Sequence, residues 1–190
     1  MIKIGLIGEH SNDTDSIAQL MRKKYNVGFH YKTLSVHKYG SQIYNESSAK
    51  TFNFEIKKYT PHCVIIVADA DAIITETTRI RYKRTLCERL SKMLNSRCIL
   101  LLNIYELEAL IFADLDRFNT LYNTSIKGNR DVSFIEKPKD ELKSKSKLPK
   151  KFKESDCSVL FNELIIDIVS KNCSYFKTFL HEFSELIDAT

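Results

Sequence analysis

The chain has 190 residues, of which 43% are hydrophobic and 11% aromatic, a composition typical of one globular domain rather than of a disordered chain. The formal net charge of +5 suits an anionic partner without requiring one. No apolar run is long enough to span a bilayer, and residues 2–8 are too short for a signal peptide because Glu9 follows at once. We therefore expect a cytoplasmic protein without a membrane partner.

The first half of the chain alternates short apolar runs with amphipathic stretches. In chain order we predict a strand, a helix, a strand, a helix and a strand, over residues 2–8, 12–25, 27–36, 41–59 and 62–69. Asn12 or Asp13 is available as the N-cap of the first helix.

The same alternation continues with a helix, a fourth strand and another helix, over residues 75–95, 97–104 and 106–118. The first of these helices turns one apolar stripe inward: Ile80, Cys87, Leu90 and Leu94. Apolar strands that alternate with amphipathic helices indicate a parallel sheet with helices on both faces. We predict an α/β fold with a Rossmann-like sheet of about four strands in residues 1–126.

Residues 127–156 have a different character. Between Lys127 and Lys153 there are ten Lys or Arg and four Asp or Glu, a net charge of +6, so the rest of the chain sums to about −1. With Pro138 and Pro149 also present, we predict a basic loop or mobile arm, and a merely solubilising linker is the alternative. Residues 157–190 predict two closing helices, 157–170 and 173–188, that pack on the core.

Several kinds of site are disfavoured. The five cysteines are odd in number and contain no CxxC pair, which favours reduced thiols over disulfides or a zinc site. The turn GLIGEH (5–10) matches neither a P-loop nor GxGxxG, so it does not predict a nucleotide cradle. No serine or cysteine lies in a recognisable nucleophile motif.

Acidic residues follow three of the four predicted strands: Glu9, then Asp69 and Asp71, then Glu106 and Glu108. Parallel sheets bind ligands beyond the carboxyl ends of their strands. Asp69 and Asp71 would face the same spot if their strand continued to residue 71. Carboxylates gathered in this way repel one another, and a divalent cation such as Mg²⁺ or Mn²⁺ offsets that repulsion.

Each of these residues also has a structural explanation. Asp13 can lean back over Glu9 from one helical turn away, or it can simply cap its helix. Glu106 and Glu108 can occupy a first helical turn, where the helix dipole favours acids. Asp69 and Asp71 can be the start of an ordinary loop. A basic helix face is by default solvated. The basic face here follows the acidic loop, which favours contact with phosphate, and its residues are Arg79, Arg81, Lys83 and Arg84.

Glu9 in IGLIGEH and the Asp69–Asp71 pair in VIIVADADA resemble the toprim domain of topoisomerases, primases, recombination proteins and OLD (overcoming lysogenization defect) nucleases. That family has a glutamate after its first strand and Asp-x-Asp after its third, around a divalent metal. GEHSND (8–13) places Glu9 and Asp13 as in OLD nucleases, with His10 where glycine is common.

A second likeness is to small toprim-like proteins that are often encoded beside ATPases in bacterial defence loci. YELEALIFAD (105–114) is similar to their Glu-x-Glu-Ala-Trp-Leu-Leu-Ala-Asp segment, with Leu110 in place of tryptophan. SYFKTF (174–179) is similar to their terminal serine-phenylalanine-basic run. The resemblance covers most of the chain.

The resemblance implies a Mg²⁺- or Mn²⁺-dependent nuclease that hydrolyses DNA or RNA in a defence or mobile-element system. It implies metal binding by Asp69, Asp71, Glu108 and Glu106, with Glu9 as ligand or general base assisted by Asp13. Basic side chains would grip the nucleic-acid backbone: Arg79, Arg81, Lys83, Lys147, Lys150 and Lys151. An ATPase partner and a homo-oligomer both accord with this prediction.

Two other functions remain open at this stage. The first is a non-catalytic toprim-like subunit that binds nucleic acid or docks on an ATPase. The second is a receiver-like or phosphatase-like domain in which Asp69 is phosphorylated or attacks phosphate. Receivers place their acidic pair directly after the first strand, where Glu9 stands nearly alone, and this disfavours the second alternative.

Overall fold

The computed structural model describes residues 1–34, 40–128, 131–147 and 150–188. Its centre is a four-stranded sheet in the order β2-β1-β3-β4, and every neighbouring pair is parallel. The strands are β1 (Ile2–Gly8), β2 (Phe29–Thr33), β3 (Cys63–Asp69) and β4 (Cys98–Asn103). The predicted α/β fold with a parallel sheet is thus confirmed; residues 35–36 of the predicted second strand lie outside the described residues.

The sheet is covered on both faces, which is why β3 is apolar along its length. Cys63, Ile65 and Val67 belong to one hydrophobic cluster, whereas Val64 and Ile66 belong to the cluster on the opposite face. A strand buried on both sides has no polar alternation, so a short β-branched run identifies it.

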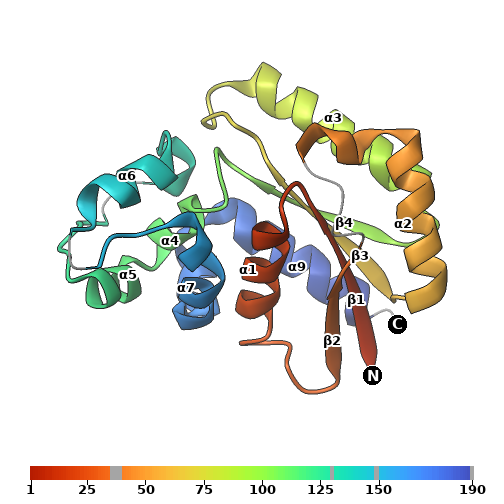
Figure 1. The fold of residues 1–190 in the computed structure, drawn as a ribbon, viewed down its shortest axis with the longest axis horizontal. Helices are drawn as coiled ribbons and strands as arrows, with labels where there is room; N and C mark the ends of the chain where they lie inside the picture. Colours follow the sequence, from red (N-terminus) through yellow and green to blue (C-terminus); the bar gives the residue numbers. More distant parts are fainter. Residues whose placement is uncertain (35–39, 129–130, 148–149, 189–190) are drawn as a thin grey trace.

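Each face of the sheet has its own helices (Figure 1). The helices α1 (Ser11–Met21) and α9 (Ser174–Asp188) lie on one face. The 3₁₀ turn η1 (Gly40–Tyr44), α2 (Glu46–Tyr59) and α3 (Thr77–Met93) lie on the other. Because β2 and β3 lie on opposite sides of β1, the chain changes direction at the β1–β3 crevice, the place where such sheets bind ligands.

The predicted helix 106–118 is wrong in its extent. It begins at Ala109 and divides at Asp114 into α4 (Ala109–Ala113) and α5 (Leu115–Tyr122). The buried carboxylate of Asp114 accepts a hydrogen bond of 2.8 Å from the backbone N–H of Ile165.

The predicted helix 157–170 is also divided, into α7 (Cys157–Glu163) and α8 (Ile166–Asn172), and Ile165 lies between them. One long-range hydrogen bond therefore joins the two helix breaks.

The segment predicted as a loop or mobile arm is instead a packed part of the fold. It contains η2 (Val132–Phe134), α6 (Pro138–Lys145) and η3 (Glu154–Asp156). Four of its apolar side chains are buried in the main core: Val132, Ile135, Leu142 and Phe152. The described residues from 109 to 172 form a helical lobe beside the sheet, in which α6 stands with α4, α5 and α7 (Figure 1).

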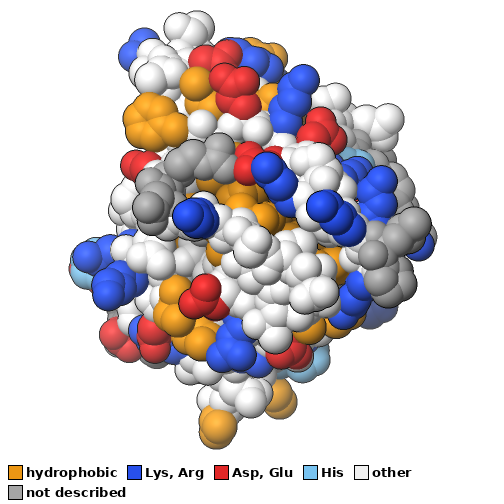
Figure 2. All heavy atoms as spheres, turned by 90° about the vertical axis from the view of Figure 1, so that its left-hand side faces the viewer, with side chains coloured by type: hydrophobic (Ala, Val, Ile, Leu, Met, Phe, Trp, Pro, Cys, Tyr) orange, Lys and Arg blue, Asp and Glu red, His pale blue; other side chains and the backbone are white. Residues whose placement is uncertain are grey.

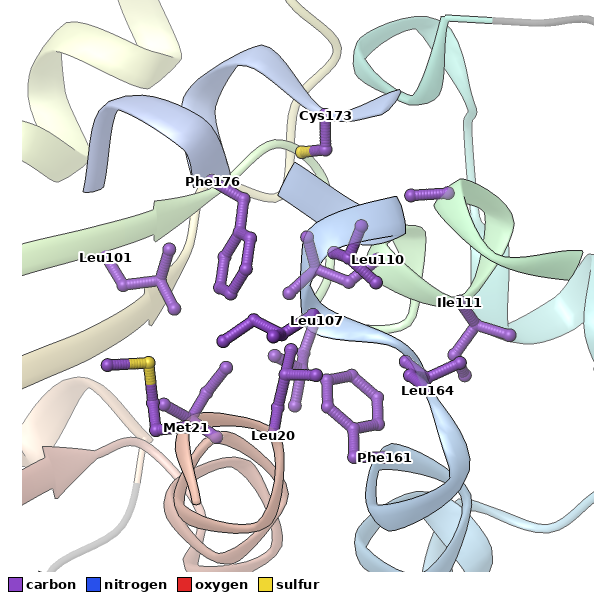
Figure 3. Close-up of a cluster of buried hydrophobic side chains, with 14 of the residues drawn as sticks. Leu20, Met21, Leu101, Leu107, Leu110, Ile111, Phe161, Leu164, Cys173 and Phe176 are labelled. Atoms are coloured by element: carbon purple, nitrogen blue, oxygen red, sulfur yellow. The ribbon is translucent and has the colours of Figure 1, made fainter. Parts of the chain in front are cut away.

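One continuous core joins the helical lobe to the sheet. Figure 3 shows side chains from α1, β4, α4, α7 and α9 meeting in it, among them Leu20, Leu101, Leu110, Phe161 and Phe176. All five cysteines are free, as predicted. No helix within the described residues is both long and apolar enough to cross a membrane.

Phe152 provides a test of this packing. It is 1% exposed and its ring lies 5.8 Å from that of Phe118 and 5.7 Å from that of Tyr122, between ring centroids. We expect Phe152→Ala to lower the free energy of unfolding by about 3–5 kcal/mol, because it removes a buried aromatic ring and leaves a cavity. Urea denaturation measures this change. The control Phe134→Ala alters a ring that is 53% exposed in the same segment and should cost at most about 1 kcal/mol. Equal losses would contradict the packed arrangement.

Candidate active site

Three neighbouring strands end at one edge of the sheet, and each delivers a polar side chain there. Glu9 follows β1 directly, Asp69 is the last residue of β3, and Asn103 is the last residue of β4. Asp69 and Asn103 are paired in register, and the Nδ2 of Asn103 donates a 3.0 Å hydrogen bond to the Oδ1 of Asp69. Of the acids predicted at the strand ends, Glu9 and Asp69 lie at the ends of neighbouring strands in the structure, whereas Asn103 was not predicted.

Three carboxylates, Asp13, Asp69 and Glu108, form what we call the inner carboxylates. Burial raises the pKa of Asp13 to about 7, with further contributions from the charges of Glu108 and Glu9. Burial also raises the pKa of Asp69, and the negative charges of Asp13, Glu108 and Glu9 raise it further. The pKa of Glu108 is raised mainly by burial. These acids are close enough to disfavour one another's ionised forms.

Local structure explains how two of the inner carboxylates are placed. The N-cap of α1 is His10, not Asn12 or Asp13, and the Oδ2 of Asp13 accepts a 3.2 Å hydrogen bond from the His10 backbone N–H. Asp13 thus supports the helix start while belonging to the cluster. Glu108 precedes α4 but makes no capping hydrogen bond, and the Cys157 thiol of α7 donates to its Oε1 at 3.6 Å.

Glu9, in contrast, already has a positive partner. The Tyr44 hydroxyl donates a 2.6 Å hydrogen bond to its Oε1, and the Lys83 ammonium forms an ion pair with the same oxygen. The side chains of Lys83 and Glu9 are only 13% and 16% exposed. Lys83 was predicted to contact nucleic acid from a solvated helix face, but the structure places it within the acidic site.

Asp71 does not join Asp69. The strand ends at Asp69, and Asp71 has a left-handed backbone with φ of 51°. Its N–H donates to the carbonyl of Tyr105, which itself has a φ of 63°. Its side chain is 61% exposed, and its Oδ2 lies 3.9 Å from the Lys83 ammonium. The strand would have to reach residue 71 for the two carboxylates to point to the same side, and it ends at Asp69. The side chains of Asp69 and Asp71 therefore do not lie together on one face of a strand.

Glu106 lies apart from the inner carboxylates, beside α6. Its Oε2 accepts a 3.4 Å hydrogen bond from the Lys139 backbone, and its Oε1 lies 3.9 Å from the Lys139 ammonium. The Lys139 ammonium also lies 3.4 Å from Glu154. Burial raises the pKa of Glu106, whereas the charge of Lys139 lowers it. Lys139 could not be predicted from the sequence, since nothing distinguishes it from the other lysines of its basic segment.

The remaining predicted basic residues lie on the surface. Arg79 and Arg81 are exposed on α3, and Arg79 pairs with Glu76 at 3.1 Å. Lys147, Lys150 and Lys151 are exposed on the helical lobe.

A groove of about 840 Å³ lies between residues 123–127 and the end of α6, and Lys127, Lys145 and Lys147 contribute to its lining. Figure 2 views the molecule from this side and shows Lys and Arg side chains around a patch of apolar surface.

The chemistry of the inner site suits a hard cation. Asp13, Asp69 and Glu108 offer only oxygen ligands, the type that Mg²⁺ and Mn²⁺ prefer. The Oδ1 of Asn103 is completely buried and has no hydrogen-bond partner among the described atoms, although its residue is bonded to Asp69. Within the described ranges, however, no three His, Cys, Asp or Glu side chains already converge as ligands of a single ion. The residue types suit the cation, but the described side chains do not form a ready metal site.

Comparisons with protein-family models, with curated proteins and with solved structures find no match for this chain. The case for a site therefore depends on the geometry and electrostatics described above.

The raised pKa of Asp13 predicts a pH dependence of stability. Because folding raises this pKa from 3.8 to about 7, the folded protein binds more protons than the unfolded chain between these values. The contribution of Asp13 is therefore fully present below about pH 4 and is lost as the pH rises through 7. We expect Asp13→Asn to reduce the fall in unfolding free energy between pH 5 and 8, measured by urea denaturation in EDTA.

The matched control is Asp15→Asn, which alters an exposed carboxylate on the same helix. This variant should keep the wild-type pH profile. If Asp13→Asn kept it as well, the raised pKa of Asp13 would be wrong.

Proposed function

We propose that this protein is a Mg²⁺- or Mn²⁺-dependent nuclease of the toprim type that hydrolyses phosphodiester bonds in DNA or RNA. The observation that carries the proposal is the gathering of Asp13, Asp69 and Glu108 at the β1–β3 crevice, where no described ion pair neutralises Asp13 or Asp69. Carboxylates gathered in a largely desolvated place repel one another, and a divalent cation offsets that repulsion.

The inner carboxylates would hold the metal in this mechanism, with Asp69 and Glu108 as its principal ligands. A metal bound there neutralises phosphate oxygens and lowers the pKa of an attacking water. Glu9, which pairs with Lys83 and is held in orientation by the Tyr44 hydroxyl, would act as the general base. Asp13 assists from the first turn of α1. Asp71 contacts Lys83 and Glu106 contacts Lys139, and the contribution of either as a metal ligand stays a prediction.

Substrate would be held through its phosphate backbone. Lys147, Lys150 and Lys151 are exposed on the helical lobe, and Arg79 and Arg81 are exposed on α3. Charges of this kind give affinity but little sequence preference. The groove beside α6 adds Lys127 and Lys145 to this basic surface.

The biological setting belongs to the same proposal. The likeness to toprim-like proteins encoded beside ATPases favours a cytoplasmic antiviral defence system with an ATPase partner, and assembly as a homo-oligomer would fit such a system. The five free cysteines accord with a reducing compartment.

A non-catalytic toprim-like subunit is the second candidate. Two observations favour it: Glu9 is already engaged in an ion pair with Lys83, and Asp71 lies apart from Asp69. Tight capture of a neighbour-encoded ATPase, without metal binding, would support this alternative. The receiver-like alternative is disfavoured, because receivers place an acidic pair directly after their first strand, where Glu9 stands nearly alone.

Nuclease activity should depend on the inner carboxylates. With Mg²⁺ or Mn²⁺ the purified protein should nick or degrade plasmid DNA or an RNA oligonucleotide. Asp69→Asn and Glu108→Gln should each reduce the rate on the order of 100-fold or more, because each removes a metal ligand while keeping the side-chain volume. The control Asp116→Asn alters an exposed carboxylate on α5 and should retain wild-type activity. Equal activities of wild type and Asp69→Asn with every metal would refute the proposed enzyme.

Nucleic-acid affinity should depend on the lysines of the helical lobe. We expect the triple variant Lys147→Ala, Lys150→Ala, Lys151→Ala to bind an oligonucleotide more weakly. The slope of log affinity against log salt should decrease by about one for each phosphate that the variant no longer neutralises. Fluorescence anisotropy over a salt series measures both effects.

The control for this variant removes three exposed lysines from α2, on the other side of the molecule: Lys50, Lys57 and Lys58. It changes the net charge by the same amount, so an equal loss of affinity would show that only overall charge matters.

A further inference from the structure

Consecutive residues at the carboxyl end of α5 line two grooves. Asn123 belongs to the groove of about 840 Å³ beside α6, and Leu121 and Tyr122 belong to a second groove of about 460 Å³. No ion pair of the described residues involves any lysine of these two linings. We call the two grooves together the lysine track, after the six lysines that line them: Lys127, Lys145, Lys147, Lys150, Lys151 and Lys153.

Hydrogen bonds within the lobe fix the walls of the first groove. The Asn119 side chain accepts hydrogen bonds of 2.6 Å from the Thr124 hydroxyl and 2.9 Å from the Ile126 N–H, and it donates one of 3.0 Å to the Ile126 carbonyl. In α6, which forms the other wall, the Ser144 hydroxyl donates to the carbonyl of Glu141 at 2.8 Å. The lining is therefore polar, and its lysines project from a fixed backbone.

The second groove combines lysines with apolar side chains. Phe152 is buried, whereas Lys151 and Lys153 on either side of it are exposed and line the groove. The Lys150 ammonium lies 5.2 Å from the centre of the Tyr122 ring, which is itself almost fully buried. The other apolar side chains of the lining are aliphatic: Leu121, Val159 and Leu160.

The charge of the track suits a polyanion. Its lining contains only two acids, Glu141 and Asp156, against six lysines. The carboxylate of Asp156 is already engaged, because it accepts hydrogen bonds from the Tyr122 hydroxyl and from the Lys153 N–H. Nucleic acid carries one negative charge for each nucleotide of a strand, so it can meet lysines along both grooves. An acidic protein segment fits less well, since the polar first groove offers nothing to its apolar side chains.

The exposed apolar surface of the second groove limits the form of the nucleic acid. Val159 is 68% exposed on α7, and apolar surface beside polar residues is typical of a binding site. In a duplex the bases are stacked inside the helix, so a duplex would place phosphates against the lysines and leave Val159 in water. A single strand presents phosphates and unstacked base faces together.

We propose that the lysine track binds single-stranded nucleic acid in preference to duplex, with phosphates on the lysines and a base against Val159. This inference rests on the proposed function, because it names the form of nucleic acid that the protein takes. It does not depend on a metal ion, since no inner carboxylate lines either groove.

The test is fluorescence anisotropy with a labelled single strand and with its duplex of the same length, in EDTA and over a salt series. Wild type should bind the single strand more tightly. Val159→Ser should weaken single-strand binding by about 3- to 10-fold, because it removes apolar contact area. Its salt slope and its affinity for duplex should not change, since no phosphate contact is lost. The control Val27→Ser alters a valine that is 94% exposed outside the track and should bind as wild type does.

The outcomes separate this inference from the function on which it rests. Duplex binding that is as tight as single-strand binding would overturn the inference and leave a nuclease of duplex standing. Unchanged single-strand affinity in Val159→Ser, or an equal loss for both forms, would also overturn it. If the protein bound a peptide of alternating Glu and Leu but neither form of nucleic acid, the track would be a protein-docking surface, and the nucleic-acid function would fall as well.

Discussion

The crowding of negative charge at one edge of the sheet is the constraint on which the rest of the structure depends. The strand order β2-β1-β3-β4 brings the carboxyl ends of β1, β3 and β4 together, and acids follow each of them. Lys83 reaches this edge from α3, and Lys139 reaches it from α6 beside Glu106. The helical lobe is therefore more than a cover for the sheet, because it brings a cation and the Cys157 thiol to acids that the strands deliver.

The parts of this arrangement that depend on local pattern could be predicted from the sequence. A strand buried on both faces has to be apolar along its length, so β3 and β4 were identifiable. Parallel pairing then puts Glu9 and Asp69 at one edge without further information. Asp71 could not be placed in this way. Its direction is set by backbone hydrogen bonds to the loop after β4, where Asp71 donates to Tyr105 and Tyr105 donates to Ala72.

The helical lobe was harder to predict because distant contacts determine it. ELEALIFADLDRF has an unbroken helical period, yet Asp114 leaves the helix to accept a hydrogen bond from Ile165, 51 residues away. In the basic segment, apolar residues are too sparse to show a helical period, and its many lysines make the mean hydropathy of the segment strongly polar. Leu142 and Phe152 are nevertheless buried there, since side chains from α5 complete a core that the segment alone could not form.

The helical spacing of Lys83 indicates burial, whereas its residue type suggests exposure. Its spacing from Ile80 and Cys87 assigns it to the inward face, but a lysine surrounded by arginines suggests a solvated surface. A nearly buried ammonium is costly to desolvate, and Glu9 offsets that cost. A purely structural pair would need no more than this. The structure also holds Asp71, 61% exposed and in a left-handed conformation, beside the same ammonium. An exposed second carboxylate adds little stability, so the pair with Glu9 is the contact that offsets most of the cost of burying Lys83.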